Sequence, residues 1–168
     1  PRGRVRAAVR PRPGVVRLAA ARVIPARLRF ARPVRTARGE FVDRASVLLE
    51  LRDADGVPGF GEAAPWVGFG MESVASAEST LWAVLGRLEG GALEPGRLPA
   101  DLAAQLQAAP AARTAIEGAL WDLAARRAGQ PLAAYLASQI GTCAGDSLRR
   151  VPVSALLVAV EPDALREA

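Results

Sequence analysis

The sequence predicts an α+β fold, in which a three-stranded antiparallel meander is followed by a bundle of helices and then by one buried strand. Polar and apolar residues alternate in the first third of the 168-residue chain, and apolar residues recur at three- and four-residue spacing in the middle. A valine-rich apolar run stands near the end. Because 51% of the residues are hydrophobic, the chain can bury the core of one ordinary domain.

Strands are predicted over 17–30, 46–53 and 57–63. The second alternates apolar and polar residues, the pattern of a strand with one buried face. An Asp-Gly pair at 55–56 supplies the backbone dihedrals of a tight hairpin turn between the second strand and the third. The segment 31–44 contains proline, threonine, glycine and several charges, so its composition predicts a long loop between the first two strands.

Helices are predicted to begin at a Ser73 cap, near Pro110 and at Leu132, each from apolar residues at helical spacing. Glycine or proline residues follow the first two, and the third is expected to be short, ending at Ala137. The run VPVSALLVAV at 151–160 predicts a strand buried on both faces of a parallel sheet. Such a strand needs partners that the chain does not supply, so we expect a truncated domain there.

The charge of the chain is unevenly distributed. Residues 1–38 carry 12 of the 22 arginines and no acid, so from Gly39 onward 10 arginines stand against 17 acids and the net charge is −7. The predicted flexible arm at 1–16 has no aromatic residue to stack on bases, which argues against nucleic acid as a partner. No run approaches the roughly 20 apolar residues of a membrane span, and the lone Cys143 fits a reducing cytoplasm.

Four segments together point to a family: PVRTARGEFVDR, GFGEAAP, PWVGFGMES and ARTAIEGALWDLAAR. In this order they resemble the enolase superfamily, in its muconate-lactonizing branch, and most of all the o-succinylbenzoate synthases of menaquinone biosynthesis. The resemblance covers about residues 23–157. The second and fourth segments suit the whole branch, whereas the third, of the form Pro-x-x-Gly-Phe-x-x-Glu-Ser, favours the synthases.

The resemblance implies an enolase-like capping domain over 17–148 and the first strand of a truncated (β/α) barrel, a TIM barrel, over 149–168. In this family the cap covers the mouth of the barrel, and two mobile loops of the cap shape the substrate pocket; here they would be 33–43 and 65–72. The family's magnesium ligands and catalytic lysines lie farther along the barrel. No catalytic and no metal-binding residue is therefore assigned to this chain, which contains no lysine and no histidine.

The two loops supply the candidate substrate-binding residues. Arginines would pair with a substrate carboxylate, glycines would lend flexibility, and aromatic side chains would shield a ring. The set comprises Arg35, Thr36, Arg38, Gly39, Phe41, Trp66, Gly68 and Phe69. Simple packing of the cap is an equally good interpretation of Trp66 and Phe69.

The acids of the chain do not predict a catalytic pair. Glu117 and Asp122 lie five residues apart on one predicted helix, about 140° apart around its axis, and Glu62 stands beside a turn. Ion pairing with Arg113 or Arg126 is the better interpretation of the two helical acids.

By resemblance, the chain is the amino-terminal part of a dehydratase, a lyase that removes a proton next to a carboxylate with magnesium and then loses water. Its partners would be a small-molecule carboxylate substrate and the missing barrel domain, and the chain as given would be inactive. An N-acylamino acid racemase or a dipeptide epimerase has the same kind of cap and remains an alternative. A non-catalytic small binding protein is the alternative from another class.

Overall fold

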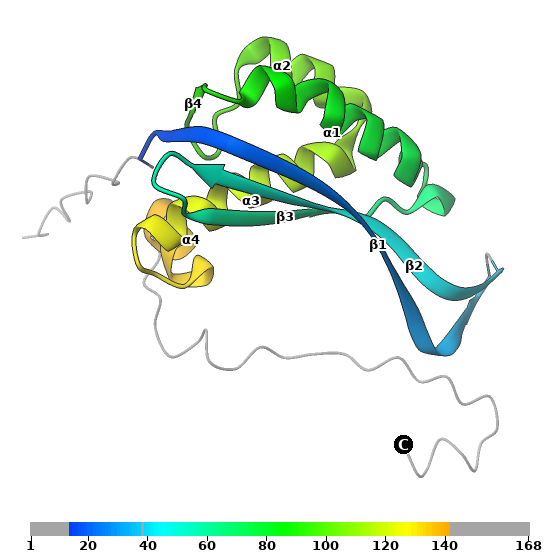
Figure 1. Ribbon diagram of the computed structural model, residues 1–168. Coiled ribbons are helices and arrows are strands. Elements are labelled where there is room, and N and C mark those ends of the chain that lie inside the picture. The colour runs from blue at the N-terminus through cyan, green and yellow to red at the C-terminus, as the bar shows by residue number, and fades with distance from the viewer. Residues whose placement is uncertain (1–13, 38, 142–168) are drawn as a thin grey trace, which may run out of the picture.

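The computed structural model describes residues 14–37 and 39–141 of the chain. They form a four-stranded antiparallel sheet in the order β3-β2-β1-β4, with helices α1 and α3 packed against it (Figure 1). The elements are β1 (Val16–Thr36), β2 (Gly39–Asp53), β3 (Pro58–Ala63), α1 (Val74–Leu88), β4 (Ala92–Leu93), α2 (Ala100–Gln105), α3 (Pro110–Arg127) and α4 (Leu132–Ile140), with short 3₁₀ turns at Val67–Phe69 and Leu106–Ala108. The predicted α+β class is confirmed.

The prediction of a long loop at 31–44 is wrong. The first strand continues to Thr36, the second begins at Gly39, and the pair Val34 and Phe41 faces across the ladder of this hairpin. The hairpin extends well past the helices (Figure 1), so most of its outer residues are exposed on both faces. A strand that is exposed on both faces does not need apolar residues at alternate positions. Its composition therefore resembles that of a loop, although the two strands are paired.

The rest of the meander is confirmed. Val47, Leu49 and Leu51 of β2 are fully buried, and β3 returns antiparallel to β2. Two short elements were not predicted, β4 and α2, because two and six residues are too few to show a period. The predicted arm at 1–16 already enters β1 at Val16; its first 13 residues, Cys143 and the predicted barrel strand lie outside the described residues.

The helices begin where their caps predict. The Ser73 hydroxyl accepts a hydrogen bond from the Ser76 amide at 3.1 Å and caps α1, and α3 starts with Pro110 at its first position. The last helix, α4, runs three residues farther than predicted, to Ile140. None of the helices in residues 14–37 and 39–141 has the length and hydropathy needed to cross a membrane.

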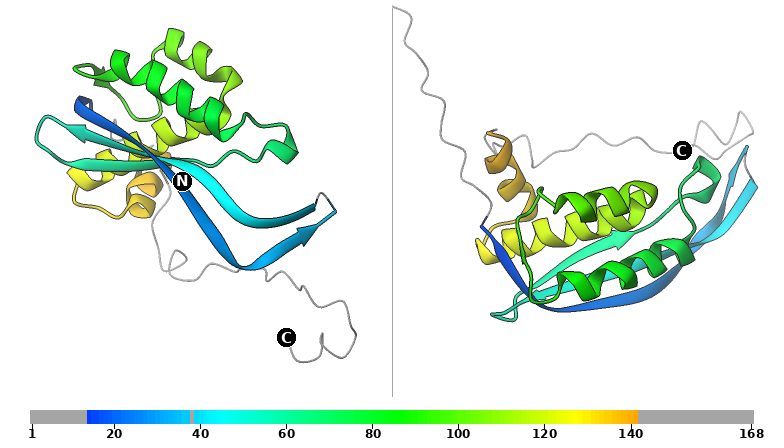
Figure 2. Two further views of the ribbon diagram at one scale, coloured as in Figure 1. Left: turned by 45° about the vertical axis from the view of Figure 1, so that its right-hand side comes forward. Right: turned by 90° about the horizontal axis from the view of Figure 1, so that it is seen from above.

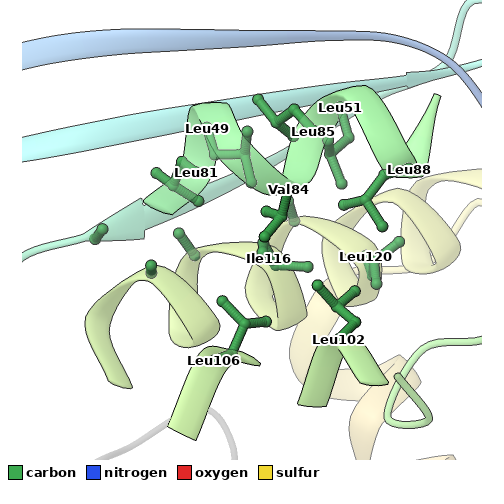
Figure 3. Packing of buried hydrophobic residues seen from close by; sticks show 14 of the residues in the cluster. Leu49, Leu51, Leu81, Val84, Leu85, Leu88, Leu102, Leu106, Ile116 and Leu120 are labelled. Atoms are coloured by element: carbon green, nitrogen blue, oxygen red, sulfur yellow. The ribbon is translucent and has the colours of Figure 1, made fainter. Parts of the chain in front are cut away.

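The core lies between β2 and the two long helices (Figure 3). Leu49 and Leu51 point from the sheet toward α1, and Ile116 and Leu120 close the layer from α3. The labelled cluster is completed by Leu81, Val84, Leu85, Leu88, Leu102 and Leu106, all nearly inaccessible to solvent. Burying each such side chain contributes roughly 1.5–3 kcal/mol, so this layer holds the sheet and helices together.

A close backbone approach brings α3 onto β3. A Cβ atom added at Gly59 would overlap the Ala119 carbonyl oxygen, and one added at Gly61 would overlap the Ala115 carbonyl oxygen. The helix contributes Ala115 and Ala119 opposite Gly61, and Ala119 and Leu123 opposite Gly59, so a side chain on either glycine would collide with helix backbone. The glycines of the segment GFGEAAP therefore set the distance between helix and sheet.

A buried carboxylate ties the β2–β3 turn to the end of α3. The side chain of Asp53 is fully buried; its Oδ1 accepts hydrogen bonds from the amides of Asp55 (3.0 Å) and Val57 (2.7 Å). Its Oδ2 accepts a hydrogen bond from Arg127 Nη1 at 2.5 Å. A turn is confirmed at the predicted place, although of the Asp-Gly pair only Gly56 has a positive φ, of 81°, and the strands end at Asp53 and resume at Pro58. The ion pair with Arg127 anchors this turn to a helix as well.

We predict that Gly61→Ala destabilises the chain by about 3 kcal/mol or more, because the new methyl group meets helix backbone that cannot yield without moving α3. The matched control is Gly86→Ala, on the open face of α1 with nothing within 4 Å. We expect that change to stabilise the chain by about 0.5–1 kcal/mol through helix propensity. Urea unfolding followed by circular dichroism measures both; a Gly61→Ala protein as stable as wild type would contradict the close contact.

Candidate functional site

The two segments that were predicted to border the substrate meet in one hollow. It has a volume of about 200 Å³ and lies between the hairpin and the β3–α1 connection. Both segments stand at the end of the molecule opposite α4 in all the views (Figures 1 and 2). The residues that line the hollow are Phe41, Asp43, Arg44, Ala45, Pro65, Trp66, Val67, Gly68 and Val74.

Aromatic rings form one wall of this hollow. The ring centroids of Phe41 and Trp66 are 5.0 Å apart at an interplanar angle of 53°, and those of Trp66 and Phe69 are 6.0 Å apart, edge to face. These separations are those of favourable aromatic pairs. Phe69 is nevertheless 66% exposed, so this wall is not closed off from solvent.

Arg44 supplies the cationic group of the site. Its guanidinium carbon lies 4.2 Å from the centroid of the Trp66 ring, and its Nη2 donates a hydrogen bond to the Ala64 carbonyl at 2.5 Å. Arg44 thus connects the hairpin to the chain that leads into the aromatic loop. Sequence reasoning missed it, because it is one arginine among many and no local pattern distinguishes it from its neighbours.

The predicted substrate-binding residues divide into two groups. Phe41, Trp66 and Gly68 line the hollow, and Phe69 touches its aromatic wall. Of the other predicted residues, Arg35, Thr36 and Gly39 lie toward the hairpin tip and are not among those that line the hollow. For all eight residues, a role in substrate binding stays a prediction.

The tip residues make local contacts instead. Arg35 donates a hydrogen bond to Glu40 at 2.7 Å, and the two residues are partners across the ladder. Glu40 precedes Phe41 on β2, so the Arg35 and Phe41 side chains lie on opposite faces of the hairpin. The Thr36 hydroxyl donates to the Gly39 carbonyl at 3.3 Å, and Gly39 has a φ of 126°, which favours glycine. Arg38 lies outside the described residues.

The aromatic loop is fastened at its carboxyl end by the last residues of the segment PWVGFGMES. Glu72 Oε1 accepts hydrogen bonds from the amides of Ala111 (2.8 Å) and Ala112 (3.2 Å), the first free N–H groups of α3. Ser73 caps α1, as described above. The Glu-Ser pair of this segment therefore joins two helix starts, and the part of the segment that reaches the hollow is 65–68.

The three candidate acids do not converge. Glu117 pairs with Arg113 at 2.9 Å and Asp122 with Arg126 at 2.8 Å, which confirms the predicted ion pairs. Asp122 also accepts a hydrogen bond from the amide of Phe60, and Glu62 is exposed. Within the described ranges no three acidic, histidine or cysteine side chains come together, so these residues offer no place for the magnesium ion that the resemblance implies.

The chain matches the family described as mandelate racemase / muconate lactonizing enzyme, N-terminal domain, over residues 19–137. It belongs to this family. The predicted membership of the enolase superfamily and the cap-like architecture are thereby confirmed. As a member of the mandelate racemase / muconate lactonizing enzyme family, the chain has relatives with several activities.

Curated relatives include both reaction types considered above. The chain is 39% identical over 101 residues to the L-Ala-D/L-Glu epimerase of Escherichia coli (strain K12), covering 60% of this chain and 29% of the relative. It is 37% identical over 109 residues to the o-succinylbenzoate synthase of Geobacillus kaustophilus, covering 60% of this chain and 28% of the relative. The chain thus aligns with less than a third of the length of either relative.

Solved structures agree with this assignment. A dipeptide epimerase from Methylococcus capsulatus, complexed with Mg and the dipeptide L-Arg-D-Lys, matches with a TM-score of 0.61 and 34% identity. The match covers 69% of this chain and 33% of that chain. The match therefore corresponds to about the amino-terminal third of such family members. Synthases and epimerases are both similar to this chain.

We predict that Glu72→Ala costs about 1–2 kcal/mol of stability, because two amides at the start of α3 lose their acceptor. The aromatic loop should also open, which faster amide hydrogen exchange at Gly68 and Gly70 would report. The control is Glu62→Ala, an exposed glutamate for which we expect a change within about 0.5 kcal/mol. Unchanged exchange in the Glu72→Ala protein would show that the loop does not depend on this anchor.

Proposed function

We propose that this chain is the substrate-selecting cap of an enolase-superfamily enzyme that acts on a small-molecule carboxylate, and that the whole enzyme is an o-succinylbenzoate synthase acting in the cytoplasm. The observation that carries the proposal is the hollow in which a hairpin and an aromatic loop, distant in sequence, come together around one cation. An aromatic wall suits a ring, and a guanidinium suits a carboxylate. Both are parts of the product named for the synthase.

The proposed division of labour assigns binding to this chain and chemistry to a barrel domain. Magnesium, when bound by the acids of such a barrel, would stabilise the charge that develops when a proton leaves the carbon next to a carboxylate. The residues of this chain would orient the substrate and keep water from it. In support, the sequence contains no lysine, and its described acids, apart from the half-buried Glu78, are engaged in ion pairs, turns and helix caps or are exposed.

Dipeptide epimerisation is the second candidate, because epimerases match the chain as well as the synthases do. The segment PWVGFGMES supports the synthase, but Glu72 and Ser73 serve as helix caps. That leaves 65–69 as the part of the segment that lies at the hollow and can discriminate between substrates. The choice between the two reactions therefore depends on what fits against the Trp66 ring.

We predict that the purified 168-residue chain forms no o-succinylbenzoate with magnesium present, since the proposed acid–base lysines are absent from its sequence. Product formation can be followed by proton NMR against a reaction without enzyme. Turnover above that background would contradict the proposed division of labour.

Exchange of caps tests the proposed reaction directly. The corresponding amino-terminal domain of the Geobacillus kaustophilus synthase and that of the Escherichia coli epimerase would each be replaced by this chain's residues 14–141. We expect the synthase hybrid to keep kcat/KM within about a hundredfold of its parent, and the epimerase hybrid to lose more than that on L-Ala-L-Glu. A Trp66→Ala version of each hybrid serves as the control, because it removes the aromatic wall. The reverse ranking of the two hybrids would favour the epimerase.

A further inference from the structure

The hollow beside Trp66 carries one unbalanced charge. Two ionisable side chains line it, those of Asp43 and Arg44. Asp43 pairs with Arg27 at 3.3 Å, so its charge is compensated. Arg44 forms no ion pair with any carboxylate of residues 14–37 and 39–141, and its one hydrogen bond there goes to a neutral carbonyl. Of the two charges in the described lining, only that of Arg44 has no oppositely charged partner.

The guanidinium of Arg44 is held in a fixed orientation. A guanidinium has five N–H donors in one plane, and a ring beneath that plane leaves its edge available. Here the Trp66 ring lies beneath the group, and one Nη2 donor is used on Ala64. Among the described residues no acceptor takes the remaining donors. Arg44 is thus pre-organised, at little further entropic cost, to receive an acceptor from another molecule.

The size of the hollow limits what it can accept. At about 200 Å³ it is smaller than the roughly 300–1,000 Å³ of pockets that enclose a drug-sized ligand, so it suits one ring or one acyl group of a larger substrate. Phe41 and Trp66 offer apolar surface for a flat group next to the cation. The expected ligand is therefore a carboxylate attached to a ring or to a short apolar chain.

We propose that Arg44 makes this hollow an anion-binding subsite, in which its free N–H groups hold a substrate carboxylate while the attached apolar group lies against Phe41 and Trp66. The inference rests on the proposed function and names its substrate class, an acid with a second carboxylate. It assigns the recognition of the carboxylate to Arg44, which lines the hollow, instead of Arg35, which is paired with Glu40 and does not line it.

The inference also separates the relatives by the charge of their substrates. A glutamate side chain, as in the name of the L-Ala-D/L-Glu epimerase, and a succinylbenzoate are both anionic. The lysine and arginine of the L-Lys-D/L-Arg epimerase are cationic, and an unpaired guanidinium would repel them. This chain is thus expected to select anionic substrates in either reaction class.

Benzoate is the probe for the experiment, with benzamide as its uncharged counterpart of the same shape. The full 168-residue chain, labelled with ¹⁵N, would be titrated with each, and the indole N–H signal of Trp66 would be identified with a Trp66→Phe variant. We expect benzoate to shift this signal in a saturable way and benzamide to bind about tenfold or more weakly. This comparison needs no change at Arg44.

Two substitutions then locate the charge. Arg44→Gln keeps a donor for Ala64 but removes the cation, and we expect benzoate binding to weaken ten- to hundredfold, roughly what a charge-assisted hydrogen bond contributes. Arg97→Gln is the matched control at an exposed arginine that is paired with Glu94 and does not line the hollow, and we expect benzoate binding within about twofold of wild type. Arg44→Lys, which retains the charge, should bind benzoate more tightly than Arg44→Gln.

Equal binding of benzoate and benzamide, no saturable shift with benzoate, or a loss for Arg97→Gln as large as that for Arg44→Gln would each overturn the inference. These outcomes differ from a failure of the proposed function. A synthase hybrid that turns over while Arg44→Gln leaves benzoate binding unchanged would reject the subsite alone. Benzoate binding through Arg44 in a chain whose synthase hybrid is inactive would reject the synthase assignment alone.

Discussion

The approach of helix α3 to strand β3 is the constraint on which the rest of this cap depends. It is possible because Gly59 and Gly61 have no side chains where the helix backbone passes. The position of α3 fixes the location of its amino-terminal amides, and those amides hold Glu72. Glu72 in turn fastens the aromatic loop that presents Trp66. A sterically required glycine pair thus determines, through a helix and a carboxylate, where the Trp66 ring stands.

The described residues form a packed body and a hairpin that projects from it (Figure 2). The body is stabilised by the leucine-rich layer and by the buried Asp53, whereas the outer hairpin is mostly exposed on both faces. The two parts meet at the hollow, through the ring pair Phe41 and Trp66 and through the Arg44 hydrogen bond. A substrate placed there would contact both parts, so binding and the position of the hairpin should be coupled.

Family membership and local geometry carry different parts of the functional argument. The family match establishes what kind of domain this is, yet synthases and epimerases share that domain, so similarity alone does not choose a reaction. The charge and shape of the hollow carry information that the match lacks. One uncompensated cation beside an aromatic wall favours an anionic substrate group, and this limits the range of candidate substrates before the reaction is known.

The sequence by itself determined the meander, the helix starts at Ser73 and Pro110, and the buried face of β2, because each depends on a local period or cap that neighbouring residues encode. Only the tertiary structure decided that 31–44 is a paired hairpin, since an exposed ribbon has no hydrophobic period to detect. It also decided that Arg44, and not Arg35, reaches the hollow. Arg35 pairs with Glu40, which lies four residues before Arg44 on β2, so the two arginines leave from the same face and differ in their distance along the hairpin from the aromatic loop. That distance depends on cross-strand register and on the packing of α3, which no local pattern encodes.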